Sequence, residues 1–178
     1  KAVMPEGWQE KFDKYFEKMD FMGINYYFPD RIGYDPDEPL KSTFAENFYS
    51  TKDKLYAEYP AGLMDVVIQL TKRYGKDIPM YVTENGISLL NHHDKEQDCN
   101  DEERIAYIRE HLRMCARLCD LGFNLKGYYY WNDADSYEEL TGYEYRFGLT
   151  YVDHKTGETC WKKSRYYYQK VCQSRMVD

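Results

Sequence analysis

The sequence predicts an α/β protein whose core is a parallel sheet covered by helices. Two observations predict this class: segments with the pattern of buried strands recur about every fifty residues, and helical patterns stand between them. Strands that alternate with helices are typical of parallel sheets joined by right-handed crossovers. Because a complete (β/α)8 barrel needs roughly 200 residues or more, the 178 residues can form part of such a TIM barrel or a small open sheet, but not a whole barrel.

Three strands are predicted, over residues 20–28, 79–83 and 125–131. The first is almost continuously apolar, which is typical of strands buried on both faces of a parallel sheet. Residues 29–58 contain three prolines and many polar side chains, and they predict a long loop of the kind that is usually functional or disordered. A second, polar loop is predicted over residues 86–99.

Four helices are predicted, over residues 8–19, 60–75, 101–121 and 163–175, and a β-hairpin over 146–160 precedes the last of them. Asn100 is the expected N-cap of the third helix. Two helices carry an apolar stripe at helical spacing, which consists of Leu63, Val67, Leu70 and Tyr74 on the second and of Ile105, Ile108, Leu112, Cys115 and Cys119 on the third.

The composition argues against several function classes. With 24 basic and 31 acidic residues the net charge is −7, and an acidic surface disfavours general nucleic-acid binding because it repels phosphate backbones. No apolar run approaches the ~20 residues that cross a bilayer, so we expect no membrane association. The first residues have no apolar signal region, and five cysteines without framework spacing predict reduced thiols. Both observations favour a cytoplasmic location.

Polar side chains follow the predicted ends of all three strands, where parallel sheets bind ligands. Asn25 and Tyr27 share one face of the first strand by alternation, Glu84 ends the second, and Trp131 ends the third. A carboxylate beside tyrosine and tryptophan suggests glycoside chemistry, in which one carboxylate attacks the anomeric carbon and another acid protonates the leaving oxygen. The 20 tyrosines of the chain suit sugar stacking and hydrogen bonding, although packing explains many of them equally well.

A series of motifs occurs in a fixed order: Asp20-Phe21-Met22-Gly23-Ile24-Asn25-Tyr26-Tyr27, Tyr59-Pro60-Ala61-Gly62-Leu63, Tyr81-Val82-Thr83-Glu84-Asn85-Gly86, Gly127-Tyr128-Tyr129-Tyr130-Trp131, Gly142-Tyr143, Arg146-Phe147-Gly148-Leu149 and Tyr151-Val152-Asp153. Together they resemble family 1 glycoside hydrolases, the family of β-glucosidases and β-galactosidases. The resemblance implies that residues 1–178 form a single domain, the C-terminal part of a (β/α)8 barrel, with about its last three strand–helix units plus a β-hairpin.

The resemblance also implies roles for individual residues. Glu84 matches the nucleophile that forms a glycosyl-enzyme intermediate, and Tyr27 matches the residue that orients it. Asn25 corresponds to a position beside the nucleophile in the site. Trp131 corresponds to the platform under the sugar, and Glu138 to the residue that contacts the outer hydroxyls of that sugar. The implied substrate is a small β-glycoside, and no cofactor or metal is implied.

The chain departs from the family pattern at two points. Glu139 occupies the position of a second sugar-contacting tryptophan and cannot stack on a sugar. The acid/base carboxylate of the family belongs to an Asn-Glu-Pro motif that precedes the matched region, and Asp37-Glu38-Pro39 lies in a loop and does not replace it. We therefore expect the isolated chain to lack efficient activity. The pattern that recognises a 6-phosphate is not evident, which favours a plain hexoside.

The sequence is also compatible with other sites and functions. The spacing of His111, Cys115 and Cys119 resembles a metal site, but three ligands over three helical turns cannot reach one ion, so packing is favoured. The alternative function is a non-catalytic sugar-binding or protein-interaction module derived from the same fold, and a third interpretation is an unrelated small α/β sheet. A three-stranded part would leave two sheet edges and an apolar interior open, so we expect it to need the N-terminal barrel part, self-association or another partner.

Overall fold

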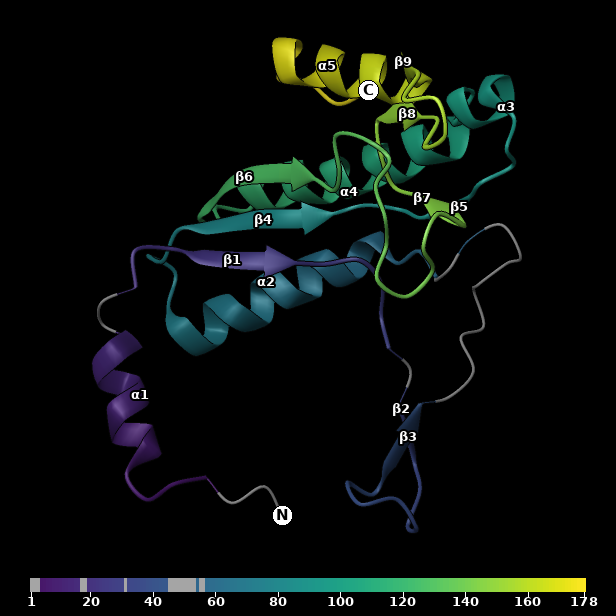
Figure 1. Cartoon of the computed structure of the whole chain (residues 1–178). Helices are drawn as coiled ribbons and strands as arrows, with labels where there is room; N and C mark the ends of the chain where they lie inside the picture. The colour runs from purple at the N-terminus through teal and green to yellow at the C-terminus, as the bar shows by residue number, and fades with distance from the viewer. Residues whose placement is uncertain (1–3, 17–18, 31, 45–53, 55–56) are drawn as a thin grey trace.

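The centre of the molecule is a three-stranded parallel sheet. The computed structural model describes residues 4–16, 19–30, 32–44, 54 and 57–178. Strands β1 (Met22–Asn25), β4 (Met80–Asn85) and β6 (Leu125–Tyr130) lie side by side in the order β1-β4-β6 and point the same way (Figure 1). Met80 pairs with Met22 on one side and with Leu125 on the other. The predicted α/β class with parallel strands is confirmed.

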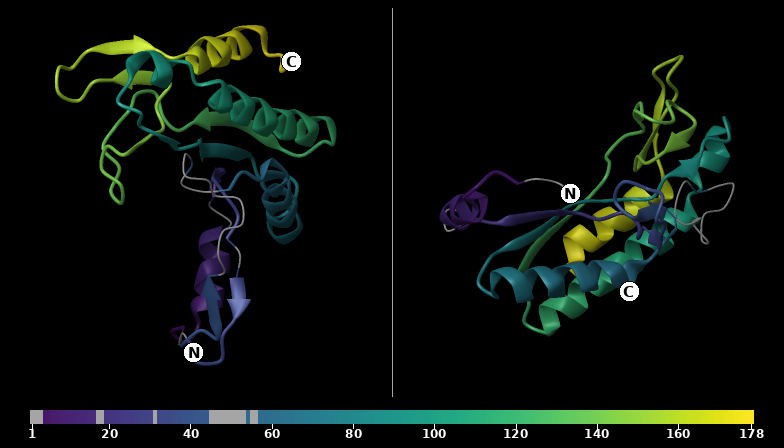
Figure 2. Two further views of the ribbon diagram at one scale, coloured as in Figure 1. Left: turned by 90° about the vertical axis from the view of Figure 1, so that its right-hand side faces the viewer. Right: turned by 90° about the horizontal axis from the view of Figure 1, so that it is seen from below.

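Helices cover one face of this sheet. They are α2 (Pro60–Tyr74), α4 (Glu102–Asp120) and α5 (Lys163–Ser174), which follow one another along the same side (Figure 2). Among the described residues no helix covers the opposite face, and α1 (Trp8–Phe16) lies to one side of the sheet (Figure 1). In the part of the chain that the structure describes, helices therefore cover one face of the sheet, whereas strands of parallel sheets are usually covered on both.

The core lies between the sheet and the helices α2 and α4. It consists of Ile24, Tyr26, Leu63, Val67, Met80, Val82, Cys115, Leu118 and Leu125. A second cluster joins α4 to α5 through Ile108, Leu112, Leu149 and Val171. Each buried Val, Leu or Ile side chain contributes about 1.5–3 kcal/mol by leaving water, so α4 is stabilised from two sides.

Two predicted loops contain regular structure. Within residues 29–58, β2 (Ile32–Tyr34) and β3 (Ser42–Phe44) form an antiparallel hairpin whose connection holds Asp37-Glu38-Pro39. Residues 45–53 and 55–56 of the same predicted loop lie outside the described residues. Within residues 86–99, β5 (Leu89–Leu90) pairs with β7 (Tyr145–Arg146), and α3 (Lys95–Cys99) follows. These elements are too short for a periodic signal to reveal them.

The predicted hairpin over residues 146–160 is smaller than expected. β8 (Thr150–Val152) pairs with β9 (Thr159–Trp161), whereas Arg146 belongs to β7 and pairs with β5. The prediction was wrong for residues 146–149 because the apolar residues Phe147 and Leu149 have the pattern of one continuous strand. In the structure the chain bends there, between the pairing of β7 with β5 and the pairing of β8 with β9.

The start and inner face of α4 also differ from the prediction. Asp101, not Asn100, is the residue before the first helical turn. Ile105 is only half-buried and Cys119 is exposed, and their expected places in the core are taken by Tyr107 and Leu118. The predicted stripe was right for Ile108, Leu112 and Cys115, which are buried, and wrong at its two ends.

The cysteines are not all reduced thiols. Cys99 at the end of α3 and Cys160 in β9 form a disulfide, which corrects the expectation of five free thiols. Cys115 is buried, and burial raises the pKa of its thiol to about 12, while Cys119 and Cys172 are exposed. The cytoplasmic location was inferred partly from the expectation of reduced cysteines, and it stays a prediction.

The described residues contain neither a metal-binding cluster nor a membrane-spanning helix. No group of three or more His, Cys, Asp or Glu side chains there is arranged to hold a metal ion. Within the same residues, no helix combines the length and the apolar character that a membrane span requires.

Two leucines near the end of α4 test where the core lies. Leu118 is fully buried, whereas the side chain of Leu121 is 60% exposed. We expect Leu118→Ala to lower the free energy of unfolding by about 2–5 kcal/mol because it leaves a cavity. Leu121→Ala should change it by less than about 0.5 kcal/mol. Urea unfolding followed by circular dichroism measures both, and equal losses would contradict this assignment of the core.

Candidate active site

The candidate site lies at the carboxyl ends of the three parallel strands. Asn25, the last residue of β1, pairs with Glu84 of β4, and Asn85 pairs with Tyr130 at the end of β6. Trp131 follows directly and its backbone N–H donates to the carbonyl of Asn85 at 2.9 Å. The polar residues that the sequence analysis placed at three separate strand ends therefore meet at one edge of the sheet.

A local irregularity in β4 sets the direction of Glu84. The register shifts near residues 83–85 against both neighbouring strands, and two successive half-buried residues, Thr83 and Glu84, stand between the buried Val82 and Asn85. Such bulges re-aim side chains next to active sites. Thr83 and Glu84 consequently both turn away from the helices, and the Thr83 hydroxyl donates to Asn25 Oδ1 at 2.7 Å.

Tyr27 and Glu84 form the central contact of the site. The phenol hydroxyl of Tyr27 donates a hydrogen bond to Glu84 Oε2 with an oxygen–oxygen distance of 2.8 Å. The ring of Tyr27 rests edge-on against Phe147, with 6.2 Å between ring centroids. A hydrogen bond from a fixed phenol restricts the orientation of the carboxylate that accepts it. Glu84 is therefore held in a defined position at the carboxyl end of the sheet.

Trp131 is tied to the turn that follows Glu84. A Cβ atom added to Gly86 would lie 2.0 Å from the carbonyl oxygen of Trp131, so only glycine fits there. The peptide bond between Trp131 and Asn132 is cis. The indole side chain remains 38% exposed, which leaves a face on which a ligand can stack.

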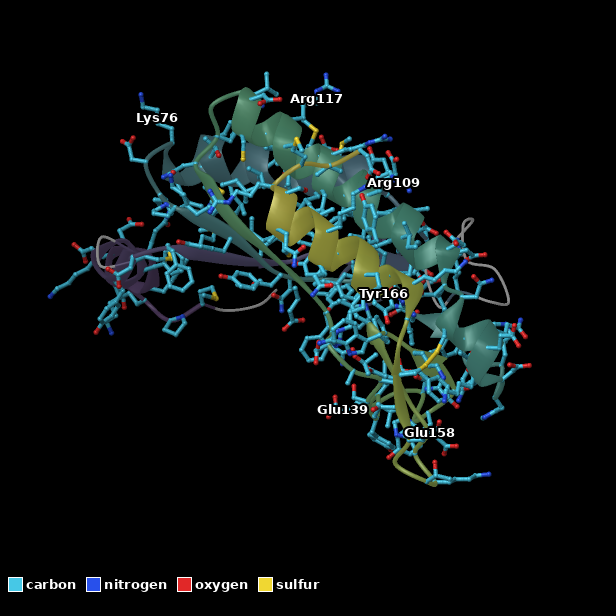
Figure 3. All side chains as sticks on the ribbon, turned by 90° about the horizontal axis from the view of Figure 1, so that it is seen from above. Lys76, Arg109, Arg117, Glu139, Glu158 and Tyr166 are labelled. Atoms are coloured by element: carbon cyan, nitrogen blue, oxygen red, sulfur yellow. A yellow bond between two sulfur atoms is a disulfide. The ribbon has the colours of Figure 1, made fainter. Side chains whose placement is uncertain are left out.

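The loop after β6 positions Glu138. Asn132 Nδ2 donates to the hydroxyl of Ser136 at 2.9 Å, and this hydroxyl donates to Glu138 Oε1 at 3.2 Å. Partial burial raises the pKa of Glu138, and the hydrogen bond from Ser136 opposes that shift. Glu139 is exposed and lies with Glu158 on the side of the molecule where the loops gather (Figure 3).

A buried arginine in α4 supports the loops around the site, and the sequence analysis did not identify it. The guanidinium of Arg104 is paired with Asp101 at 2.8 Å and donates to the carbonyls of Ile87, Arg146 and Phe147 at 2.7–3.0 Å. It also donates to the hydroxyl of Tyr130 at 2.8 Å. A signal existed, because the polar residues Asp101, Arg104, Tyr107 and His111 recur at helical spacing.

A second buried charge cluster fixes the loop that carries Glu138. Asp135 accepts hydrogen bonds from Arg146 at 2.6 Å, from the Lys162 ammonium at 2.7 Å and from the backbone N–H of Gly148 at 3.0 Å. Burial is the main reason why the pKa of Lys162 falls to about 8, and the attraction of Asp135 opposes that fall. Removing one partner of such a buried pair leaves an uncompensated charge, so the loop is held firmly.

The structure therefore brings the predicted residues together to different degrees. Tyr27 and Glu84 are in direct contact, and Asn25 is linked to the same strand through Thr83. Trp131 borders the turn after Glu84, whereas Glu138 and Glu139 belong to the following loop. Asn25, Trp131 and Glu139 are exposed to solvent.

Comparisons with known proteins identify the family of the chain. The model of glycosyl hydrolase family 1 matches residues 1–177. β-Glucosidase A of Thermotoga maritima is 30% identical over the whole chain, which spans 40% of that enzyme. A 6-phospho-β-galactosidase of Staphylococcus haemolyticus is 32% identical over 89% of the chain, which spans 38% of that enzyme.

Solved structures agree as well. The family 1 β-glucosidase of T. maritima superimposes with a TM-score of 0.86 and 29% identity, over 98% of this chain and 39% of that one. A β-glucosidase from Exiguobacterium marinum gives a TM-score of 0.76 with 30% identity, over 88% of this chain and 36% of that one. The chain thus spans about two-fifths of the relatives it matches.

The buried side chain of His111 in α4 should make the stability of the chain sensitive to acid. Its Nδ1–H donates to the Tyr107 carbonyl at 2.9 Å, and burial lowers the pKa of the ring from 6.5 to about 4. Between pH 6.5 and pH 4 the His111 ring is therefore protonated in the unfolded chain but neutral in the folded chain. We expect this residue to remove about 3 kcal/mol of stability as the pH falls from 6.5 to 4.

Unfolding in urea at several pH values checks this expectation. His111→Gln should lose less stability than the unsubstituted chain across that range, even if it is less stable at pH 7. His93→Asn, at an exposed histidine, should leave the pH dependence unchanged. The same slope for all three chains would show that His111 does not titrate as described.

Proposed function

The chain belongs to glycosyl hydrolase family 1, and from this premise we propose that it carries the nucleophile of a retaining β-glycosidase. The hydrogen bond of 2.8 Å between the Tyr27 hydroxyl and Glu84 Oε2 is the observation that carries the proposal. It joins two strand ends beside an accessible tryptophan, and ligands of parallel α/β sheets bind at such ends.

In the proposed reaction a carboxylate oxygen of Glu84 attacks the anomeric carbon of a β-glycoside. The bond from that carbon to the leaving oxygen breaks, and an acid protonates the leaving oxygen, which gives a covalent glycosyl-enzyme and a free alcohol. In the second step the same acid, now a base, takes a proton from water. The water oxygen displaces Glu84 and releases the sugar with its original configuration.

The remaining residues would bind and orient the sugar. Tyr27 orients Glu84 toward the substrate through the hydrogen bond from its hydroxyl. Trp131 offers its exposed indole to the C–H face of the sugar. Asn25, Glu138 and Glu139 supply polar groups for hydroxyls, and Glu138 is steadied by Ser136.

We propose that the acid/base residue comes from a part of the fold outside this chain. A retaining site needs two carboxyl groups about 5–5.5 Å apart, and the chain spans only about two-fifths of the matched β-glucosidase. Asp37-Glu38-Pro39 is an unsuitable source because it lies in the β2–β3 connection and not at a strand end. The isolated chain should accordingly be a poor catalyst.

The exposed surface supports the need for such a partner. The chain exposes 12181 Å², whereas a compact protein of 21.4 kDa exposes roughly 9,000 Å². Strands β1 and β6 each have one unpaired edge within the described sheet, and open edges invite pairing. We propose that the rest of a family 1 barrel, or a second copy of this chain, covers these edges.

The charge of the loop after β6 favours an unphosphorylated sugar. Between Asn132 and Tyr145 the chain has five acidic residues and no lysine or arginine. A sugar phosphate would meet Glu138 and Glu139 without a basic partner from this loop, and like charges repel at short range. Among the activities named for the relatives, that of the β-glucosidases is therefore a better guide than that of the 6-phospho-β-galactosidases.

One alternative function has a specific observation in its favour. Glu139 stands at the position where the family pattern has a tryptophan that stacks on the sugar. The loss of this stacking side chain suits a sugar-binding or protein-interaction module without catalysis. The contact between Tyr27 and Glu84 argues against it, since binding alone does not require an oriented nucleophile.

Covalent labelling tests the nucleophile. We propose to co-express the chain with the part of T. maritima β-glucosidase that it does not cover, and to treat the complex with a 2-deoxy-2-fluoro-β-glucosyl fluoride. The fluorosugar should add to one peptide of this chain, at Glu84, as read by mass spectrometry. Glu84→Gln should abolish the adduct. An intact complex that folds but takes no label would support the non-catalytic alternative.

Substrate choice gives a second test on the same complex. Because the loop after β6 is acidic, kcat/KM for nitrophenyl β-glucoside should exceed that for its 6-phosphate by at least about tenfold, equivalent to about 1.4 kcal/mol. Steady-state release of nitrophenol measures both values. A preference for the 6-phosphate would refute the electrostatic argument but not the role of Glu84.

A further inference from the structure

Asn85 follows Glu84 in the chain but points to the opposite side of the sheet. Its side chain is fully buried beneath the site, between the sheet and α4. The amide nitrogen donates to the carbonyl of Tyr26 at 2.6 Å and to the hydroxyl of Tyr107 at 2.8 Å. The amide oxygen accepts from the hydroxyl of Tyr128 at 2.6 Å. The side-chain amide of Asn85 therefore links β4 to the segment after β1, to β6 and to α4.

These contacts complete a ring around Tyr27. The hydroxyl of Tyr107 donates to the carbonyl of Tyr27 at 3.2 Å. Asn85 therefore binds the carbonyl of Tyr26 directly, and it is connected to the carbonyl of Tyr27 through the Tyr107 hydroxyl. The backbone N–H of Tyr26 donates to the carbonyl of Glu84 at 2.9 Å. The ring closes on the other face, where the phenol of Tyr27 meets Glu84.

The chemistry of the ring fixes which way the amide faces. A peptide carbonyl can only accept, so the group against Tyr26 must be the nitrogen of Asn85. Both of its N–H groups are used, one on Tyr26 and one on Tyr107. Aspartate has the same shape but no N–H, and it would set an acceptor against the Tyr26 carbonyl. Buried acceptors that face each other without a proton between them are costly.

We infer that Asn85 is a positioning residue for the Glu84–Tyr27 pair, an inference that rests on the proposed function. Asn85 touches no reacting atom, since it lies on the helix side of the sheet. It fixes where the main chain of Tyr26 and Tyr27 sits relative to Glu84, and thereby the distance from the Tyr27 hydroxyl to the carboxylate. Loss of its N–H groups should disturb that distance while leaving the sugar platform at Trp131 in place.

The test compares two isosteric changes in the labelled complex described above. Asn85→Asp removes the donors of the ring. Asn91→Asp is the matched control, because Asn91 is also buried and its amide nitrogen also donates to a carbonyl, that of Tyr143 at 2.9 Å, outside the ring. The measurement is the rate constant of fluorosugar labelling at saturation, its half-saturating concentration and the final number of labelled sites per chain.

We expect Asn85→Asp to slow labelling at saturation by about 100-fold, the cost typical of a misplaced reacting group. The half-saturating concentration and the final number of sites should stay near those of the unsubstituted complex, and Asn91→Asp should match it in all three values. A purely structural role would lower the number of sites and leave the rate per site unchanged. That result, or an unchanged rate, would overturn the inference.

Hydrogen exchange separates this inference from the proposed function. If the unsubstituted complex takes no label, the proposed function fails, and exchange in the same complex still tests the ring. In Asn85→Asp the amide of Tyr26 should exchange at least about tenfold faster. The amide of Met80, at the far end of β4, should be unaffected. Equal acceleration of both amides, or of neither, would overturn the inference.

Discussion

The polar groups at the carboxyl edge of the sheet need hydrogen-bond partners, and α4 supplies several of them from the side that the helices cover. A buried carbonyl without a donor is costly, and the segments after β1 and β4 and around β7 present several. The guanidinium of Arg104 satisfies three of them, while Tyr107 and Asn85 satisfy those of Tyr26 and Tyr27. The inner face of α4 thus has two roles. Its apolar side chains pack in the core, and its polar side chains hydrogen-bond to the segments that carry the candidate site.

This division explains how far the sequence predicted the fold. The strands over residues 79–83 and 125–131 and the helix over 60–75 were found because their side chains follow the burial pattern of their element. The inner face of α4 was predicted only in part, because buried polar residues such as Arg104 and His111 share it with the apolar ones. The elements β2, β3, β5 and α3 were missed because they are held by pairing with distant segments, which no local pattern records.

The sequence predicted several residues of the candidate site but not the tertiary contacts that position them. Motif positions indicated Tyr27, Glu84 and Trp131, and the structure brings the first two into contact. The bulge in β4, the disulfide between Cys99 and Cys160 and the cluster around Asp135 depend on how chain segments meet in space. The cluster illustrates the difficulty, because Asp135, Arg146 and Lys162 read separately as ordinary surface charges but are buried together.

The close approach of Gly86 to the carbonyl of Trp131 couples two parts of the site that could otherwise vary independently. The turn that directly follows Glu84 and the main chain of Trp131 share one contact with no room for an added methyl group. A protein engineer who wished to reshape the candidate site by moving the indole would have to shift the carboxylate with it. Changes in ligand preference should therefore arise more easily in the distal loop, around residues 136–145, than at the tryptophan itself.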